Sequence, residues 1–150
     1  MIIEAKTHIV DYAIEDPVRP NIEKEQRINE RSKVLYYITP TEARTDEQDP
    51  EAIICVKFCN KIPTNEIELE EFTGLDNSVL VLYTVWSYKR GAGAELVREL
   101  VPYVKKHFPA IKRICTLSPK TRTARVFHIR NGAFELQENE ETINYEYSME

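Results

Sequence analysis

Two short segments in the last third of the chain combine side chains that can do chemistry. Thr116-Leu117-Ser118-Pro119 carries two hydroxyls, and Phe127-His128-Ile129-Arg130-Asn131-Gly132-Ala133 follows with an imidazole. Thr116 and Ser118 are two residues apart, so on a regular strand both hydroxyls project from the same side. Histidine ordinarily titrates near neutrality, which suits proton delivery. We expect these three side chains to line one pocket, where they can hold a carbonyl oxygen and deliver a proton.

Each of these candidate catalytic residues also has a structural explanation. Ser118 is suited to cap a helix that has Pro119 at its first position. Thr116 is a common strand residue, and His128 beside Phe127 can be a packed, hydrogen-bonded core histidine. The sequence alone does not choose between the two hydroxyls.

A glycine-containing turn lies upstream of these segments. Arg90-Gly91-Ala92-Gly93 joins an apolar, strand-like run to a long amphipathic helix. Glycines let backbone N–H groups approach an anion closely, and the start of a helix carries fractional positive charge. Lys89, Arg90 and Arg98 add local positive charge to this stretch. An ordinary strand-to-helix turn is the alternative to a phosphate-binding loop.

Composition limits the class of protein. The chain has 150 residues, of which 42% are hydrophobic and 30% charged, as expected for one globular domain over residues 1–150. A net charge of −5 argues against a nucleic-acid partner. The N-terminus lacks the apolar core of a signal peptide, and no run has the ~20 apolar residues of a membrane span. We expect a cytoplasmic location and no membrane contact.

Three cysteines occur in the chain, at Cys55, Cys59 and Cys115. They cannot all pair, and at least two fall in apolar, strand-like runs, so we expect free, buried thiols. Cys55-x-x-x-Cys59 lacks the spacing and the nearby histidine of a zinc site, so no metal is expected.

The remaining pattern predicts strands and helices in alternation. Strands are expected at Lys6–Ile14, Lys33–Thr39, Ala52–Cys59, Ser78–Ser87, Ile111–Leu117, Ala133–Gln137 and Thr142–Met149. Helices are expected at Pro20–Ser32, from Ala92 to Phe108 and from Ser118 to Asn131-Gly132. Pro102 can kink the second helix, and Pro40–Pro50 is expected to be a loop.

In this context, the turn and the later histidine segment resemble the GNAT superfamily of acyl-CoA transferases. Arg90 and Gly93 match its pyrophosphate loop, whereas Glu95 departs from it by adding negative charge. The resemblance implies an α/β fold with a mixed, mostly antiparallel sheet flanked by helices. It also implies that coenzyme A contacts the strand and the loop, at Val85, Trp86, Lys89, Arg90, Gly91, Ala92, Gly93 and Ala94.

Within that superfamily, the last two-thirds of the chain look like the catalytic domain of malonyl-CoA decarboxylase. The resemblance lies in Tyr83-Thr84-Val85-Trp86-Ser87, Cys115-Thr116-Leu117-Ser118-Pro119 and the histidine segment. It implies that His128 acts with Thr116 or Ser118 on malonyl-CoA. The chain lacks the family's long insertion before the histidine, and the resulting short spacing is that of an acetyltransferase.

Three activities therefore stay open. The first is decarboxylation of a malonyl thioester. The second is transfer of an acetyl group from acetyl-CoA to an amine, with His128 as the acid and Glu70, Glu71 or water as the base. The third is acyl-CoA binding without catalysis. The expected partner is a small-molecule acyl-CoA, with a carrier protein or an amine acceptor as further candidates.

Overall fold

In a computed structural model of the chain, the structure describes residues 1–6, 11–12, 15–40, 49–74 and 76–150. The helices are α1 (Lys24–Arg27), α2 (Glu66–Glu71), α3 (Ala92–His107) and α4 (Arg122–Arg130). The strands are β1 (Ile2–Glu4), β2 (Ser32–Tyr37), β3 (Ala52–Cys59), β4 (Val79–Ser87), β5 (Arg113–Thr116), β6 (Ser118–Pro119), β7 (Phe134–Glu138) and β8 (Thr142–Tyr147).

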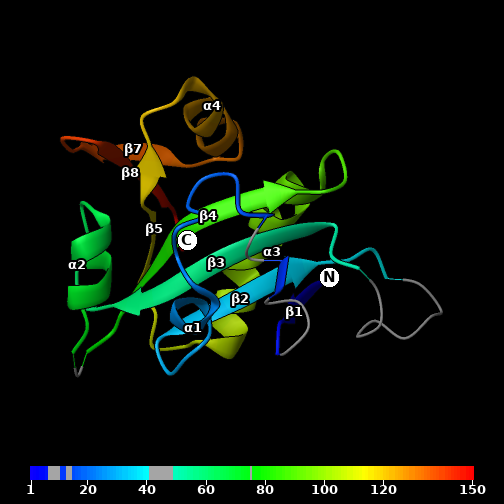
Figure 1. Cartoon of the computed structure of the whole chain (residues 1–150), viewed down its shortest axis with the longest axis horizontal. Helices are drawn as coiled ribbons and strands as arrows, with labels where there is room; N and C mark the ends of the chain where they lie inside the picture. Colours follow the sequence, from blue (N-terminus) through cyan, green and yellow to red (C-terminus); the bar gives the residue numbers. More distant parts are fainter. Residues whose placement is uncertain (7–10, 13–14, 41–48, 75) are drawn as a thin grey trace.

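The described strands form one mixed sheet in the order β1-β2-β3-β4-β5-β8-β6, with β7 paired to β8. Only the β4–β5 pair is parallel among them. A parallel pair needs a long crossover, and α3 provides it. Figure 1 shows α3 behind the sheet, α1 in front of it, and α4 beside β7 and β8 at one end.

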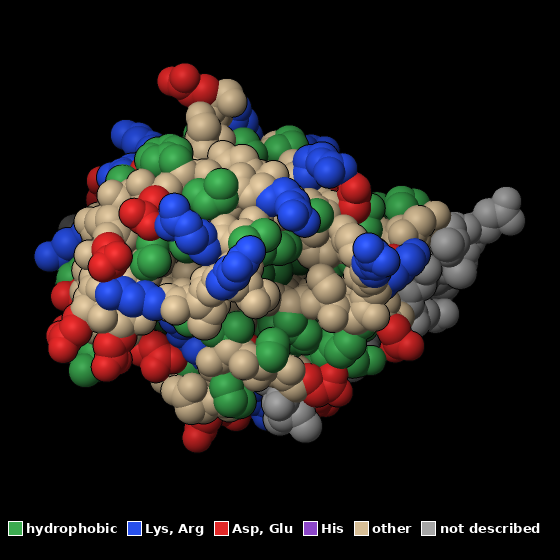
Figure 2. All heavy atoms as spheres, turned by 90° about the horizontal axis from the view of Figure 1, so that it is seen from above, with side chains coloured by type: hydrophobic (Ala, Val, Ile, Leu, Met, Phe, Trp, Pro, Cys, Tyr) green, Lys and Arg blue, Asp and Glu red, His purple; other side chains and the backbone are tan. Residues whose placement is uncertain are grey.

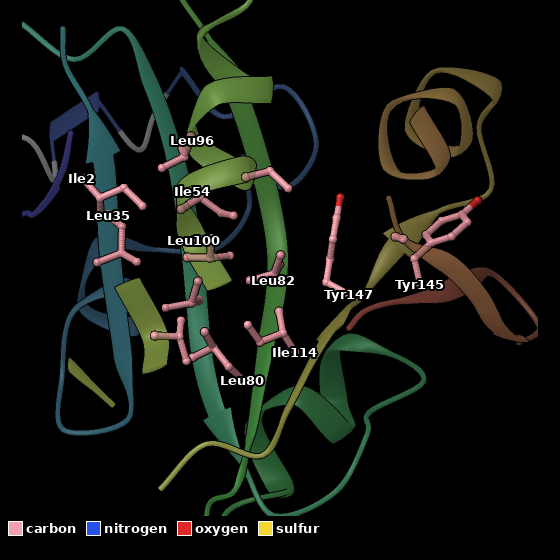
Figure 3. Close-up of a cluster of buried hydrophobic side chains, with 14 of the residues drawn as sticks. Ile2, Leu35, Ile54, Leu80, Leu82, Leu96, Leu100, Ile114, Tyr145 and Tyr147 are labelled. Carbon is pink, nitrogen blue, oxygen red and sulfur yellow. The ribbon is translucent and has the colours of Figure 1, made fainter. Parts of the chain in front are cut away.

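Both faces of the sheet are covered by apolar side chains. Leu96, Leu100 and Val104 repeat along α3 at helical spacing and pack on Leu80 and Leu82 of β4. Figure 3 shows this cluster, with Tyr145 and Tyr147 of β8 set apart at its α4 end. The opposite face is covered by a second cluster around Ile53, Val81 and Leu69. Because both faces of the central strands are buried, their sequences read as continuous apolar runs.

The parallel pair separates halfway along β4. Register runs only from Val79↔Arg113 to Leu82↔Thr116, and Leu117 N–H then donates to the Leu82 carbonyl at 2.9 Å. An extra residue, Tyr83, falls in β4 opposite the step from Cys55 to Val56 and forms a β-bulge. From Tyr83 to Ser87, β4 therefore has β3 on one side and none of the described strands on the other. This gap is where the cleft described below opens.

Most of the predicted elements are confirmed. Strand β3 has the predicted bounds, and α3 continues through Pro102 to His107. Helix α4 ends at Arg130, with Asn131 as its C-cap and Gly132 following at φ 99°. All three cysteines are free and buried, as predicted.

Two predictions differ from the structure, and two elements were not predicted. Ser118 does not cap a helix: Ser118–Pro119 is the short strand β6, and Thr121 caps α4 by accepting from Ala124 N–H at 3.2 Å. The predicted helix at Pro20–Ser32 shrinks to four residues. Strand β1 and helix α2 were not predicted. The predicted strand at Lys6–Ile14 and loop at Pro40–Pro50 lie largely outside the described residues.

Candidate active site

A cleft of about 530 Å³ opens between the free edge of β4 and the β6–α4 segment. Its wall is largely apolar, with six hydroxyl-bearing side chains and one imidazole. The lining residues are Pro17, Val18, Leu82, Tyr83, Thr84, Val85, Trp86, Ser87, Leu117, Ser118, Pro119, Thr121, Thr123, Ala124, Phe127 and His128. No carboxylate, lysine or arginine occurs in this described lining. The cleft therefore has hydrogen-bonding groups but no charged base.

His128 lies two turns into α4 and lines this cleft. Its Nδ1 is 2.7 Å from the Tyr147 hydroxyl, and its ring stacks on Tyr145 with centroids 5.2 Å apart. Burial lowers the pKa of His128 from 6.5 to about 4, because the charged ring would lose its hydration. The expectation of a neutral-range pKa is therefore wrong. At physiological pH the imidazole is therefore neutral.

The two candidate hydroxyls are neighbours, but only one of them lines the cleft. The oxygens of Ser118 and Thr116 are 2.8 Å apart. Thr116 is fully buried, accepts a hydrogen bond from Tyr145 N–H at 3.0 Å and does not line the cleft, whereas Ser118 does. The Ser118 hydroxyl donates to Thr116 in this arrangement. Because each hydroxyl can donate or accept, Thr116 can donate to Ser118 instead when a ligand oxygen in the cleft takes the Ser118 hydrogen.

A second hollow, of about 550 Å³, adjoins the first at the start of α3. It is lined by Ser87, Gly91, Gly93, Ala94, Arg122, Thr123, Val126, Phe127, Arg130 and Asn131. Glu95 N–H makes the first hydrogen bond of the helix, to the Gly91 carbonyl at 3.1 Å, and Ala92 N–H donates to the Lys89 carbonyl at 3.1 Å. The N–H groups of Gly93 and Ala94 therefore have no acceptor within the helix. These groups and the two arginines suit an anion.

The glycines of this loop meet specific requirements. Gly91 has φ 86°, a left-handed conformation that other residues adopt at a cost. A Cβ on Gly93 would lie 2.5 Å from Ser87 Oγ and 3.4 Å from the Phe127 ring. Glycine at position 93 thus keeps the helix start open toward α4. These features suit an anionic group bound at the start of α3.

The other residues predicted to contact coenzyme A are distributed unevenly. Val85 and Trp86 line the cleft, while Gly91, Gly93 and Ala94 line the second hollow. Ala92 packs in the core, and Lys89 pairs with Glu51 at 3.1 Å. Arg90 is exposed and lines neither space. The negative charge of Glu95 is offset by Arg98 at 2.7 Å.

Sequence reasoning missed the arginines of α4. Arg122 and Arg130 line the second hollow, and neither forms an ion pair within the described part of the chain. Figure 2 shows basic side chains gathered on the face seen from above, which carries α4. The sequence does contain a pattern that could have indicated them: Arg122, Val126 and Arg130 are spaced four residues apart and so share one helix face.

A buried ionic network on the opposite side of the cleft was also missed. Asp16 and Arg27 form an ion pair at 2.8 Å with no exposed side-chain surface. Asp16 also accepts from the Thr84 hydroxyl at 2.8 Å, and Arg19 donates to the Tyr83 carbonyl. The network fastens the segment before α1 onto the bulge of β4. It thereby holds Pro17 and Val18 in the cleft wall.

Solved structures show which fold this arrangement belongs to. GphF, a GNAT-like decarboxylase in complex with isobutyryl-CoA, aligns over 100% of both chains with a TM-score of 0.73 and 10% identity. Arabidopsis thaliana NAA60, in complex with acetyl-CoA, covers 98% of this chain and 97% of its own, with a TM-score of 0.64 and 12% identity. The chain has the GNAT fold.

A malonyl-CoA decarboxylase from Agrobacterium vitis is also similar. It matches 83% of this chain with a TM-score of 0.63 and 21% identity. This chain spans only 34% of that protein's length. No protein-family model matches the sequence, and no curated protein matches it significantly. The GNAT fold, with its likeness to malonyl-CoA decarboxylase, is therefore established from structure, at low sequence identity.

Two further features bear on this GNAT fold. No helix in the described ranges has both the length and the apolar character needed to cross a membrane. Within the same ranges, no three His, Cys, Asp or Glu side chains come together in a way that could hold a metal ion.

Proposed function

We propose that the chain is an acyl-CoA enzyme that decarboxylates a malonyl-type thioester. The pyrophosphate of the CoA thioester would lie over Gly91 and Gly93, between the start of α3 and the arginines of α4. The pantetheine arm would follow the free edge of β4, and the thioester would end between Ser118 and His128. The GNAT fold, and neighbours of that fold that bind acyl-CoA, support this placement.

The chemistry requires a stabilised enolate. The bond between the carboxylate carbon and the adjacent CH₂ breaks, CO₂ leaves, and the electron pair moves onto the thioester oxygen. Protonation at carbon by a solvent proton then gives the acetyl thioester. Hydrogen-bond donors aimed at the developing oxyanion lower the barrier most. Ser118 and the neutral His128 are two of the donors that line the cleft, and the apolar wall favours loss of the charged carboxylate.

One observation carries this proposal: the cleft combines two donors with no charged base. Acyl transfer to an amine needs a group that removes a proton from the nucleophile. Glu70, one of the predicted bases, pairs with buried Lys57 at 2.7 Å, and neither Glu70 nor Glu71 lines the cleft. Decarboxylation needs no such base, so the lining suits it better.

The test is conversion of malonyl-CoA to acetyl-CoA without any acceptor, followed by chromatography of the CoA esters. We expect turnover in buffer alone and its loss in H128A. Binding of malonyl-CoA without any formation of acetyl-CoA would refute the decarboxylase activity and leave a binding domain.

A specific contact favours acetyl transfer as the second candidate. Tyr88 donates to Glu15 and accepts from Trp86 Nε1 at 3.0 Å. Since Trp86 lines the cleft, Tyr88 connects the Glu15 carboxylate to the cleft wall. Burial, together with Glu15, raises the pKa of Tyr88 to about 12. An amine docked there would find its base in Glu15. Thiol release from acetyl-CoA only in the presence of an amine, and its loss in E15Q, would support this activity instead.

A further inference from the structure

We propose that Tyr147 is a positioning residue: its hydroxyl donates to Nδ1 of His128 and fixes the imidazole in the tautomer that carries its hydrogen on Nε2, toward the cleft. This inference rests on the proposed function, because it explains how a neutral histidine becomes a dedicated hydrogen-bond donor. The contact joins β8 to α4 across 19 residues of sequence.

The direction of this hydrogen bond follows from the surroundings of the two groups. Tyr147 is buried, with 5% exposure, and burial raises its pKa, so the phenol keeps its hydrogen. Among the described residues, Nδ1 of His128 is its hydrogen-bond partner. If Nδ1 donated instead, the phenolic hydrogen would have no acceptor in the described protein. Leaving a buried donor unpaired is costly, so donation by Tyr147 is favoured.

The other ring nitrogen faces open space. No described group bonds Nε2, yet it is not among the solvent-inaccessible unpaired atoms, which are Ser32 Oγ, Tyr83 Oη and Tyr145 Oη. The ring lines the cleft, so Nε2 reaches into it. In Figure 3 the Tyr147 hydroxyl points away from Leu80 and Ile114, toward the α4 end of the sheet.

No described charged side chain competes for the imidazole. The rings packed on it are Phe127 of its own helix and Tyr145 and Tyr147 of β8. Arg125, one turn earlier on α4, is held by Glu135 at 2.6 Å. The tautomer is therefore set by Tyr147 and not by a carboxylate, in contrast to the usual acid–histidine pair.

Nitrogen-detected NMR of the histidine rings tests the tautomer without relying on activity. The chain has three histidines, so the His128 signals are assigned by their loss in H128Q. We expect Nε2–H and a hydrogen-bonded Nδ1 from pH 5.5 to 8, and a shifted Nδ1 signal with a mixed tautomer in Y147F. A hydrogen on Nδ1 in the wild-type protein would overturn the inference, as would ring signals unchanged in Y147F.

Kinetics then test the role of this contact in turnover. We expect Y147F to lower kcat about tenfold with KM changed less than about twofold. The control Y103F removes the hydroxyl of a part-buried tyrosine on α3, away from the cleft, and should leave kcat unchanged. Thermal melts of both variants verify folding.

A double-mutant cycle separates positioning from packing. The amide nitrogen of glutamine reaches the place of Nε2 and carries hydrogens whatever the phenol does. Y147F should therefore cost about tenfold in the wild-type background and less than about twofold in the H128Q background. An equal loss in both backgrounds would mean a merely structural role. If no substrate turns over, the proposed function fails, while the NMR result still decides the tautomer.

Discussion

At the scale of single residues, the candidate site is built from hydrogen-bonded groups and not from charged ones. Thr116 accepts hydrogen bonds from Tyr145 N–H and from the Ser118 hydroxyl, while Tyr147 donates to His128. Each cleft-facing group is thus oriented by a buried partner that the cleft does not touch. Such outer partners hold a site in its working geometry.

Burial of His128 predicts a pH-dependent stability. Its pKa is about 4 in the folded protein and near 6.5 when exposed, so the unfolded chain binds the extra proton between these values. Stability is fully present above pH 6.5 and falls as pH drops toward 4, by about 3 kcal/mol from this group. Urea unfolding at a series of pH values measures this dependence, and the unfolding free energy should vary less with pH in H128Q. An unchanged slope would contradict the buried neutral histidine.

The two hydroxyls should separate in their mutational effects. S118A removes a donor from the cleft and should lower kcat by about 10²–10³-fold, with stability changed by about 1 kcal/mol or less. T116V should lower stability by about 1–3 kcal/mol, because the Tyr145 N–H loses its acceptor, and T116S should restore it. Turnover assays and denaturant melts measure the two effects. Full activity in S118A would exclude Ser118 from the reaction.

At the scale of elements, the cleft lies between two segments that flank the point where the pairing of β4 with β5 ends. On one side, Asp16 and Arg27 fasten the chain before α1 to the β4 bulge. On the other, α4 presents Arg122 and Arg130 to the second hollow. We expect the buried ion pair to affect the stability of the fold, and the two arginines to affect ligand affinity.

Breaking the buried pair should be costly. D16N leaves the Arg27 guanidinium buried without its counter-charge, and we expect a loss of about 3–5 kcal/mol in unfolding free energy. The matched control is D11N, since Asp11 pairs with Lys24 at 3.4 Å with both side chains largely exposed. That control should cost less than about 1 kcal/mol. Equal effects of D16N and D11N in denaturant melts would contradict the buried network.

The arginines of α4 should govern affinity for coenzyme A. R122Q and R130Q are each expected to raise the Kd about five- to tenfold, with a weaker salt dependence of binding. Arg125 lies on the same helix but is paired with Glu135 and lines neither space, so R125Q is the control and should bind normally. Titration calorimetry with coenzyme A measures all three. Equal affinities across these variants would place the phosphates elsewhere.

The sequence predicted the central elements well, because their patterns are strong. Strand β3 is a continuous apolar run, and α3 repeats its apolar residues at helical spacing over four turns. Ser118-Pro119 has the same local chemistry as a helix start, but its pairing with Ile143 and Thr142 of β8 makes it a strand. Helix α2 has only Leu69 buried in six residues, which is too little periodicity to detect.

The site was predictable only in part. Ser118, His128 and the loop glycines were visible because their types and spacing suggest chemistry. The cleft itself arises where β4–β5 pairing stops at Leu82 and Thr116, and this depends on contacts between distant segments. The Tyr147–His128 contact and the Asp16–Arg27 pair are likewise tertiary, so no local pattern marks them.

At the scale of the whole molecule, one mixed sheet places two kinds of surface in series. The hollow at the start of α3 is bordered by Arg122 and Arg130 and is less apolar than the cleft, in a chain whose net charge is −5. The adjoining cleft is mainly apolar and leads to Ser118 and His128. This order matches a ligand with a charged nucleotide end and a reactive thioester end. The likeness to GphF over the full length of both chains concerns this architecture.

A crystal structure with a non-hydrolysable malonyl-CoA analogue tests the central claim most directly. We expect the diphosphate at the N–H groups near Gly93, and the oxygen that replaces the thioester carbonyl about 2.7–3.1 Å from both Ser118 Oγ and His128 Nε2. An acyl group bound instead beside Tyr88 and Glu15, with neither donor in reach of that oxygen, would contradict decarboxylation at this site.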